Sequence, residues 1–151
     1  MVEVTGDKPI LAVRVVDTNG KAHSHSPMEM SQNIFGTDGA DLVNLNSQLR
    51  ACSFNQLRIN PGEIAAEHKL APGVIQVDID IDIAGGSDRY AIHNAVTTAV
   101  QAQLGHNLPG PYQHVMYMLE VRLFFTFTMT LGFLYYHACS YLTLCAVCGP
   151  F

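Results

Sequence analysis

The chain has 151 residues, of which 48% are apolar, and a formal net charge of −5. This length gives room for one modest domain with a buried core, and the negative charge excludes the basic surface typical of nucleic-acid-binding proteins. The N-terminus has acidic residues early and no basic region followed by an apolar stretch, so it does not read as a secretory signal. The sequence therefore indicates either a cytosolic protein or a chain that begins inside a longer precursor.

The charged residues are unevenly distributed along the chain. Every Asp, Glu, Lys and Arg lies at or before Arg122, and the uncharged residues 123–148 are rich in Phe, Leu, Tyr, Thr and Cys. About 20 apolar residues suffice to cross a bilayer, so this stretch predicts a membrane segment with Arg122 at the interface. A tail that packs on the sheet is the alternative. We therefore divide the chain into residues 1–120 and 121–151.

The first elements expected are a strand and a helix. Ile10–Val16 is an apolar run closed by the turn signal DTNG, which is typical of a buried strand. The tetrapeptide SPME then has the form of a capping box with Pro at the first helical position. In such a box, Ser26 accepts from an early backbone N–H and Glu29 reaches back. We expect a helix over Pro27–Phe35 with Gly36 as its stop signal.

The middle of the chain predicts a second helix and two strands. The helix is expected near Leu42–Arg50, and a strand over Asn55–Asn60 is ended by Pro-Gly. Val74–Ile83 (VIQVDIDIDI) alternates with a period of two, so the Val and Ile side chains lie on one face of a strand and the Asp side chains on the other.

The last elements expected are a long helix and a strand, His114–Leu119. Ser87 or Asp88 can cap the helix, and Gly105 marks its end. The alternation of strands and helices favours an α/β fold with a mostly parallel, twisted sheet, flanking helices and right-handed crossovers. The apolar stripe of the helix consists of Ile92, Ala95, Val96, Ala99, Val100 and Leu104.

Two patterns resemble metal motifs but lack residues that those motifs require. Asp78, Asp80 and Asp82 resemble the start of a calcium loop, which also needs Gly at the sixth position and Glu at the twelfth. Those positions hold Ile83 and Arg89. A solvated strand face, with charges that discourage edge pairing, is the simpler interpretation.

The second pattern surrounds His106. If this residue were the second ligand of a zinc-peptidase H-E-x-x-H helix, Ala102 would occupy the first ligand position and Gln103 that of the Glu. Alanine cannot bind zinc, and an amide cannot take the proton. A helix stop followed by a loop is the better interpretation.

Two further groups contain potential metal ligands. His23 and His25 could share a strand face, but no third ligand is identifiable, and a solvated loop is the plainer interpretation. The other group lies in the uncharged tail, where zinc-like spacing is incomplete and buried apolar thiols are the better interpretation. That group is His137, Cys139, Cys145 and Cys148. No residue is therefore assigned a catalytic, cofactor-binding or metal-binding role.

Five phrases occur in an order that resembles the front part of the gametolysin-type zinc metallopeptidases, a metzincin-like family. The resemblance covers Ile10 to Leu119, and its most specific part is the FG–xG–xxVNLxSQ–ACS stretch. The phrases are ILAVRVVDTNGK, MSQNIFGTDGADLVNLNSQLRACSFNQLRI, GVIQVDIDIDI, the helix with HNAVTTAV, and HVMYML.

The resemblance implies a zincin-like N-terminal subdomain and, in the family, zinc-dependent hydrolysis of extracellular-matrix or cell-wall proteins and glycoproteins. The family's zinc motif, H-E-x-x-H-x-x-G-x-x-H, follows the strand matched by His114–Leu119 and is missing here. We therefore expect a truncated, inactive peptidase domain that holds no zinc. A membrane-anchored, noncatalytic binding module is the alternative. The family is secreted or extracellular, and self-association through an uncovered apolar surface is expected.

The resemblance ends abruptly near Glu120. The family tends to have Cys-Leu-Pro where this chain has Met118-Leu119-Glu120, which implies that Cys52 has lost its disulfide partner. Val121-Arg122 is also what a codon pair at the start of an intron would encode. Translated intron or an altered reading frame is thus a further interpretation of residues 121–151.

Overall fold

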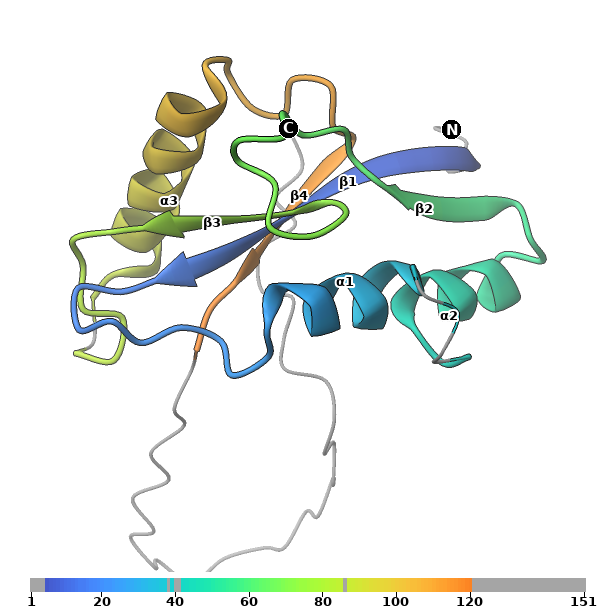
Figure 1. Cartoon of the computed structure of the whole chain (residues 1–151), viewed down its shortest axis with the longest axis horizontal. Coiled ribbons are helices and arrows are strands. Elements are labelled where there is room, and N and C mark those ends of the chain that lie inside the picture. The colour runs from blue at the N-terminus through green and yellow to red at the C-terminus, as the bar shows by residue number, and fades with distance from the viewer. Residues whose placement is uncertain (1–4, 38, 40–41, 86, 121–151) are drawn as a thin grey trace, which may run out of the picture.

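A computed structural model of the chain describes residues 5–37, 39, 42–85 and 87–120, in which four strands form one sheet with helices on both faces (Figure 1). The predicted α/β class, the mostly parallel sheet and the order of the elements are confirmed. In chain order the elements are β1 (Gly6–Val16), α1 (Pro27–Phe35), α2 (Leu45–Cys52), β2 (Leu57–Pro61), β3 (Val74–Asp78), α3 (Arg89–Leu104) and β4 (His114–Met118).

Strand β1 organises the sheet, because it pairs in parallel with each of the other three strands. Its first half, Gly6–Ile10, pairs with β2, and its second half, Ala12–Val16, pairs with β3. Residues Ile10–Arg14 pair with β4. Since Ile10 is paired with both β2 and β4, and Ala12 with both β3 and β4, strand β4 lies on the opposite edge of β1 from β2 and β3.

The two faces of the sheet carry two separate apolar clusters, because side chains alternate along β1. Ile10 and Ala12 face α1, where they pack with Met30, Ile34 and Phe35. Leu11, Val13 and Val15 face α3, where they pack with Val96 and Val100. Figure 1 shows the resulting layers, with α1 and α2 on one side of the sheet and α3 on the other.

The helix boundaries follow the local capping signals. The Ser26 hydroxyl accepts from the Glu29 N–H at 3.3 Å, and a Glu29 carboxylate oxygen accepts from the Ser26 N–H at 2.7 Å. The bond from the Ser26 N–H, followed by one that the Ser26 hydroxyl donates to the same carboxylate at 2.8 Å, holds the pKa of Glu29 below its usual value of 4.5. Gly36 ends the helix in the left-handed conformation, so the helix predicted over Pro27–Phe35 is confirmed. Asp88, one of the two predicted caps, starts α3 by accepting from the Tyr90 N–H at 3.2 Å.

The strand predicted over Val74–Ile83 is too long, since β3 ends at Asp78. Its partner β1 ends at Val16, where the Asp17 carboxylate accepts from the N–H groups of Asn19 and Lys21 and turns the chain. Beyond this turn, β1 offers no further strand residues with which β3 could pair. The chain folds over instead, and the Asp82 carboxylate accepts from the Gly85 N–H at 3.0 Å.

Other boundaries also differ from the predicted ones. Strand β1 starts four residues before Ile10, because its polar beginning pairs with β2. The second helix is Leu45–Cys52, since Asn44 rather than an earlier residue supplies its cap. The strands predicted over Asn55–Asn60 and His114–Leu119 are Leu57–Pro61 and His114–Met118.

Candidate functional site

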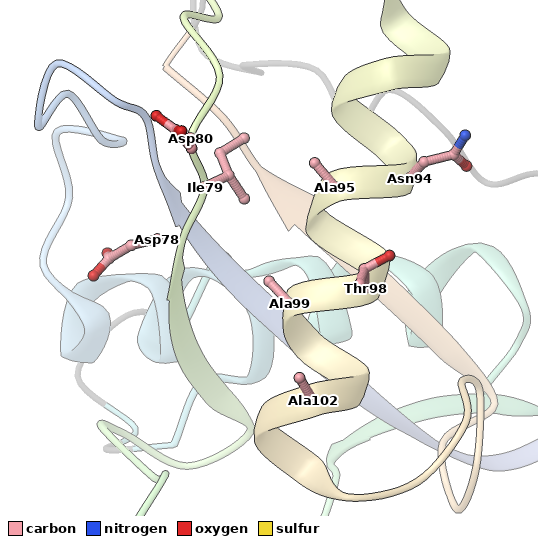
Figure 2. A pocket seen from close by; sticks show the side chains of 8 residues that line it. All are labelled: Asp78, Ile79, Asp80, Asn94, Ala95, Thr98, Ala99 and Ala102. Atoms are coloured by element: carbon pink, nitrogen blue, oxygen red, sulfur yellow. The ribbon is translucent and has the colours of Figure 1, made fainter.

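A surface hollow lies between the end of β3 and α3, beside the carboxyl end of the sheet (Figure 2). Open α/β sheets commonly bind their ligands at this end of the strands. The hollow has a volume of about 450 Å³. Its lining residues are Asp78, Ile79, Asp80, Asn94, Ala95, Thr98, Ala99 and Ala102.

The sequence builds this hollow from two periodicities. The alternation of β3 directs Ile79 towards the helix, and Figure 2 shows Ala95, Ala99 and Ala102 on the facing side of α3. Val96 and Val100 anchor the same helix in the core with no exposed surface. Because the alanine side chains are short, the helix packs on the sheet while its margin beside β3 stays unfilled.

The polar groups around the hollow do not converge on one point. In Figure 2 the carboxylates of Asp78 and Asp80 point away from the helix, and the side chain of Asn94 points away from the strand. The Asp80 carboxylate instead accepts from the Thr18 hydroxyl at 3.0 Å. Acid–base catalysis needs groups within hydrogen-bond reach of one reacting atom. This arrangement can receive an apolar side chain, but it presents no catalytic pair.

A second group of polar side chains lies on the opposite face, around Arg14. Its guanidinium donates through Nη1 to Gln76 Oε1 at 2.7 Å and through Nη2 to the carbonyl of His23 at 3.2 Å. The Nε atom is buried and makes no hydrogen bond to the residues that the structure describes. Arg14 thereby ties neighbouring strands to the loop that leads into α1.

His23 is a buried residue of this loop, and its Nδ1 atom accepts from the His25 N–H at 3.3 Å. Burial, followed by the nearby His25 and Arg14, lowers the pKa of His23 below its ordinary value, while Glu120 acts in the opposite direction. The rings of His23 and His25 lie 5.0 Å apart. The two predicted metal candidates are therefore neighbours, but the His23 acceptor nitrogen is directed at a backbone N–H.

The predicted calcium-like carboxylates do not form a common site. Asp78 lies on β3, whereas Asp80 and Asp82 lie in the turn that follows, so the interpretation as one strand face holds only for the first of them. Across the described part of the chain, no three His, Cys, Asp or Glu residues are grouped as metal ligands would be. The candidate group His137, Cys139, Cys145 and Cys148 lies outside the described residues.

The region of His106 agrees with the interpretation as a helix stop. Helix α3 ends at Leu104, and Gly105 follows it in the left-handed conformation. Ala102 and Gln103 thus occupy the last turn of the helix, and His106 lies in the loop beyond it. Cys52 is an exposed free cysteine at the end of α2.

The described part of the FG–xG–xxVNLxSQ–ACS stretch includes the last residue of α1 and the whole of α2, and so contributes to the corner between these helices. Asn44 caps α2 by accepting from the Ser47 N–H at 2.9 Å. Asn46 Oδ1 accepts from the Ile59 N–H at 3.1 Å and so attaches the corner to β2. The Ser31 hydroxyl donates to the Pro72 carbonyl at 2.7 Å and attaches α1 to the segment before β3. These side chains hold the corner against the sheet.

Sequence reasoning missed the hollow and the Arg14–Gln76 pair. Ala95 and Ala99 belong to the predicted helical stripe and Ala102 does not, but only the position of α3 relative to β3 leaves space beside these alanines. No family model, curated protein or solved structure matches the chain. Within the described ranges no helix is long and apolar enough to span a bilayer. The membrane segment predicted over residues 123–148 lies outside those ranges.

Proposed function

We propose that residues 10–119 are the sheet-forming first part of a gametolysin-type zinc metallopeptidase domain, with a zincin-like subdomain fold, and that this chain has no peptidase activity. The observation that carries the proposal is the α1–α2 corner. The described part of the most specific phrase of the resemblance lies there, and its Asn46 side chain accepts from the Ile59 N–H of β2. A phrase with this role belongs to the scaffold of a domain rather than to its catalytic centre.

The residues of this chain do not fit the family's zinc. Such a site needs three protein ligands and a water, with a Glu placed to activate that water. The sequence contains no His-Glu-x-x-His. Among the described residues, the rings of His23 and His25 are neighbours, but a nitrogen of His23 is already directed at a backbone N–H. The family's zinc-dependent hydrolysis therefore has no counterpart among these residues.

The test is a combined metal and activity measurement on the purified 151-residue chain. After incubation with zinc and dialysis, we expect well under one equivalent of zinc by atomic emission. We also expect no cleavage of a fluorescent casein or of a hydroxyproline-rich glycoprotein. A known zinc peptidase assayed in parallel is the positive control. Zinc near one equivalent, or cleavage that a chelator abolishes, would contradict the proposal.

The alternative, a membrane-anchored noncatalytic binding module, depends on the uncharged residues 123–148. Membrane fractionation separates the two proposals. If these residues are an anchor, the full chain sediments with membranes and a variant ending at Glu120 moves to the soluble fraction. A full chain that stays in the soluble fraction would rule out the anchor and leave the scaffold proposal intact.

Self-association is proposed from the apolar surface around α2. Three of the most exposed large apolar side chains flank this helix, namely Leu42 at 84%, Val43 at 67% and Phe54 at 89% exposure. Contiguous apolar patches on a protein surface promote association. Light scattering of the full chain should show species larger than a monomer, and Phe54→Ser should reduce them.

A further inference from the structure

Strand β3 pairs with β1 along one edge, whereas on its other edge the described residues pair only with Val74, through Leu70 and Ala71. Ala12 N–H donates to Gly73 O at 2.8 Å, and Ile79 N–H donates to Val16 O at 2.9 Å, so the odd-numbered residues of β3 bond towards β1. Backbone groups of successive strand residues point to opposite edges. Those of Gln76 and Asp78 therefore point to the outer edge, with which no strand of the described ranges pairs.

Past the end of the strand the chain bends at Asp80 and Ile81, and the Thr18 N–H donates to the carbonyl of Ile81 at 3.2 Å. The outward-facing backbone groups of the strand are therefore those of Gln76 and Asp78. The hollow of Figure 2 lies against this stretch, since Asp78, Ile79 and Asp80 all line it. An open row of N–H and C=O groups is a template for an added strand. Here that row has a hollow beside it.

The geometry of an added strand fixes which of its side chains meet which surface. A strand paired about 4.8 Å from β3 would direct alternate side chains to opposite faces of the sheet. One set would enter the hollow between Ile79 and the alanines of α3, where small apolar side chains fit. The other set would lie beside Asp78 and Asp80, whose exposed carboxylates point away from α3.

The charges decide between occupants of this edge. If a second copy added its own β3, aspartates would face aspartates across the pair, and like charges opposite one another destabilise a sheet. Basic side chains at the same positions would face carboxylates and be attracted. Arg14, a cation on the neighbouring strand β1, is bonded to Gln76 and to the His23 carbonyl.

We propose that the outer edge of β3 and the adjoining hollow bind an extended peptide segment in which small apolar and basic residues alternate. The peptide adds as a further strand, its apolar side chains enter the hollow, and its basic side chains lie beside Asp78 and Asp80. This inference goes beyond the proposed function, because it needs neither zinc nor peptidase ancestry.

Fluorescence anisotropy with the full chain tests the charge requirement. The probe is a labelled peptide of alternating valine and lysine, seven residues long, and the comparison peptide alternates valine and glutamate. We expect the lysine peptide to bind at least tenfold more tightly. The double variant D78N/D80N should weaken that binding about tenfold, whereas E63Q/E67Q, which removes two exposed charges elsewhere, should not. Equal affinity for both peptides, or equal effects of both double variants, would overturn the proposal.

Two further variants separate strand addition from simple charge attraction. A99L fills the hollow and should weaken binding at least fivefold, while A91L adds the same volume at an exposed position of α3 outside the hollow and should have little effect. Circular dichroism confirms that both variants fold. If A99L folds and binds the lysine peptide as well as the unaltered chain does, the hollow is not part of the site and the proposal fails.

N-methylation of the peptide tests the backbone hydrogen bonds. One peptide carries N-methyl groups on all its lysines and another on all its valines. One of these two peptides should lose binding, and the other should keep it. Loss with methylated lysines would indicate an antiparallel added strand, and loss with methylated valines a parallel one. Equal effects of the two sets, or no effect of either, would exclude pairing along the strand edge.

Discussion

The side-chain amide of Asn44 occupies the space that a Cβ atom on Gly36 would need. Such a Cβ would lie 3.0 Å from Asn44 Cγ and closer still to Nδ2. Gly36 also has a φ of 69°, in the left-handed region that ends α1. The end of α1 and the cap of α2 are therefore built against each other, and this close approach sets the angle of the α1–α2 corner.

Replacing Gly36 with alanine should destabilise the fold more than its backbone conformation alone requires. The left-handed conformation costs about 1–2 kcal/mol for an alanine, and displacing Asn44 from its cap adds about 1 kcal/mol. Gly20→Ala is the matched control, because Gly20 has a φ of 73° and open space around its Cβ position. Urea unfolding followed by circular dichroism measures both. Equal losses for the two variants would show that the approach of Asn44 does not matter.

Ser31→Ala should also destabilise the protein, although serine and alanine differ by one oxygen. Ser31 is fully buried, and its hydroxyl donates to the Pro72 carbonyl at 2.7 Å. Losing this bond leaves a carbonyl without its partner and should cost about 1–3 kcal/mol. Ser24→Ala, at an exposed position of the β1–α1 loop, is the control and should change the free energy of unfolding little. A shift of the urea midpoint no larger than that of the control would contradict the prediction.

The stability of the protein should fall as the pH drops below about 6.5. Burial, with His25 and Arg14, lowers the pKa of His23 in the folded state, so the unfolded chain takes up a proton at a higher pH than the folded one does. The neutral, buried His23 therefore contributes its full stabilisation at a pH above its pKa in the unfolded chain. This contribution is lost as the pH falls towards the lower pKa that His23 has in the folded state. Thermal unfolding between pH 7.5 and 5 measures the slope.

His23→Gln should make that slope shallower, because an amide does not titrate yet can still accept from the His25 N–H. His114→Gln removes an exposed imidazole from β4 and serves as the comparison. If the two variants show the same dependence of melting temperature on pH, His23 is not the group responsible.

Tyr117→Phe should loosen the attachment of α3 to the sheet. The hydroxyl of Tyr117 lies 2.8 Å from Thr97 Oγ1 and joins β4 to α3, and burial raises the pKa of this phenol. Loss of one part-buried hydrogen bond should cost about 1 kcal/mol. Hydrogen exchange should quicken for the α3 amides, and Tyr90→Phe, at a position 70% exposed, should leave it unchanged. If the α3 amides exchange at the unaltered rate in both variants, the bond between Tyr117 and Thr97 does not stabilise the attachment of α3.

The sequence by itself determined the features that depend on nearby residues. Ser26 and Glu29 cap α1 through bonds that span three residues, and Gly36 and Gly105 end their helices through their own conformational freedom. The stripe of α3 follows from the helical period, and alternation along β1 assigns its side chains to opposite faces. These signals were sufficient to predict the α/β class and the order of the elements.

Only the tertiary structure decided how far the strands extend and where a site lies. The alternation of VIQVDIDIDI continues to Ile83, but β3 ends at Asp78 because a strand needs a partner and β1 turns away at Asp17. Conversely, the polar start of β1 becomes a strand because β2 lies beside it. The hollow beside Ala99 depends on the distance between a helix and a strand edge, and no local pattern in the sequence encodes that distance.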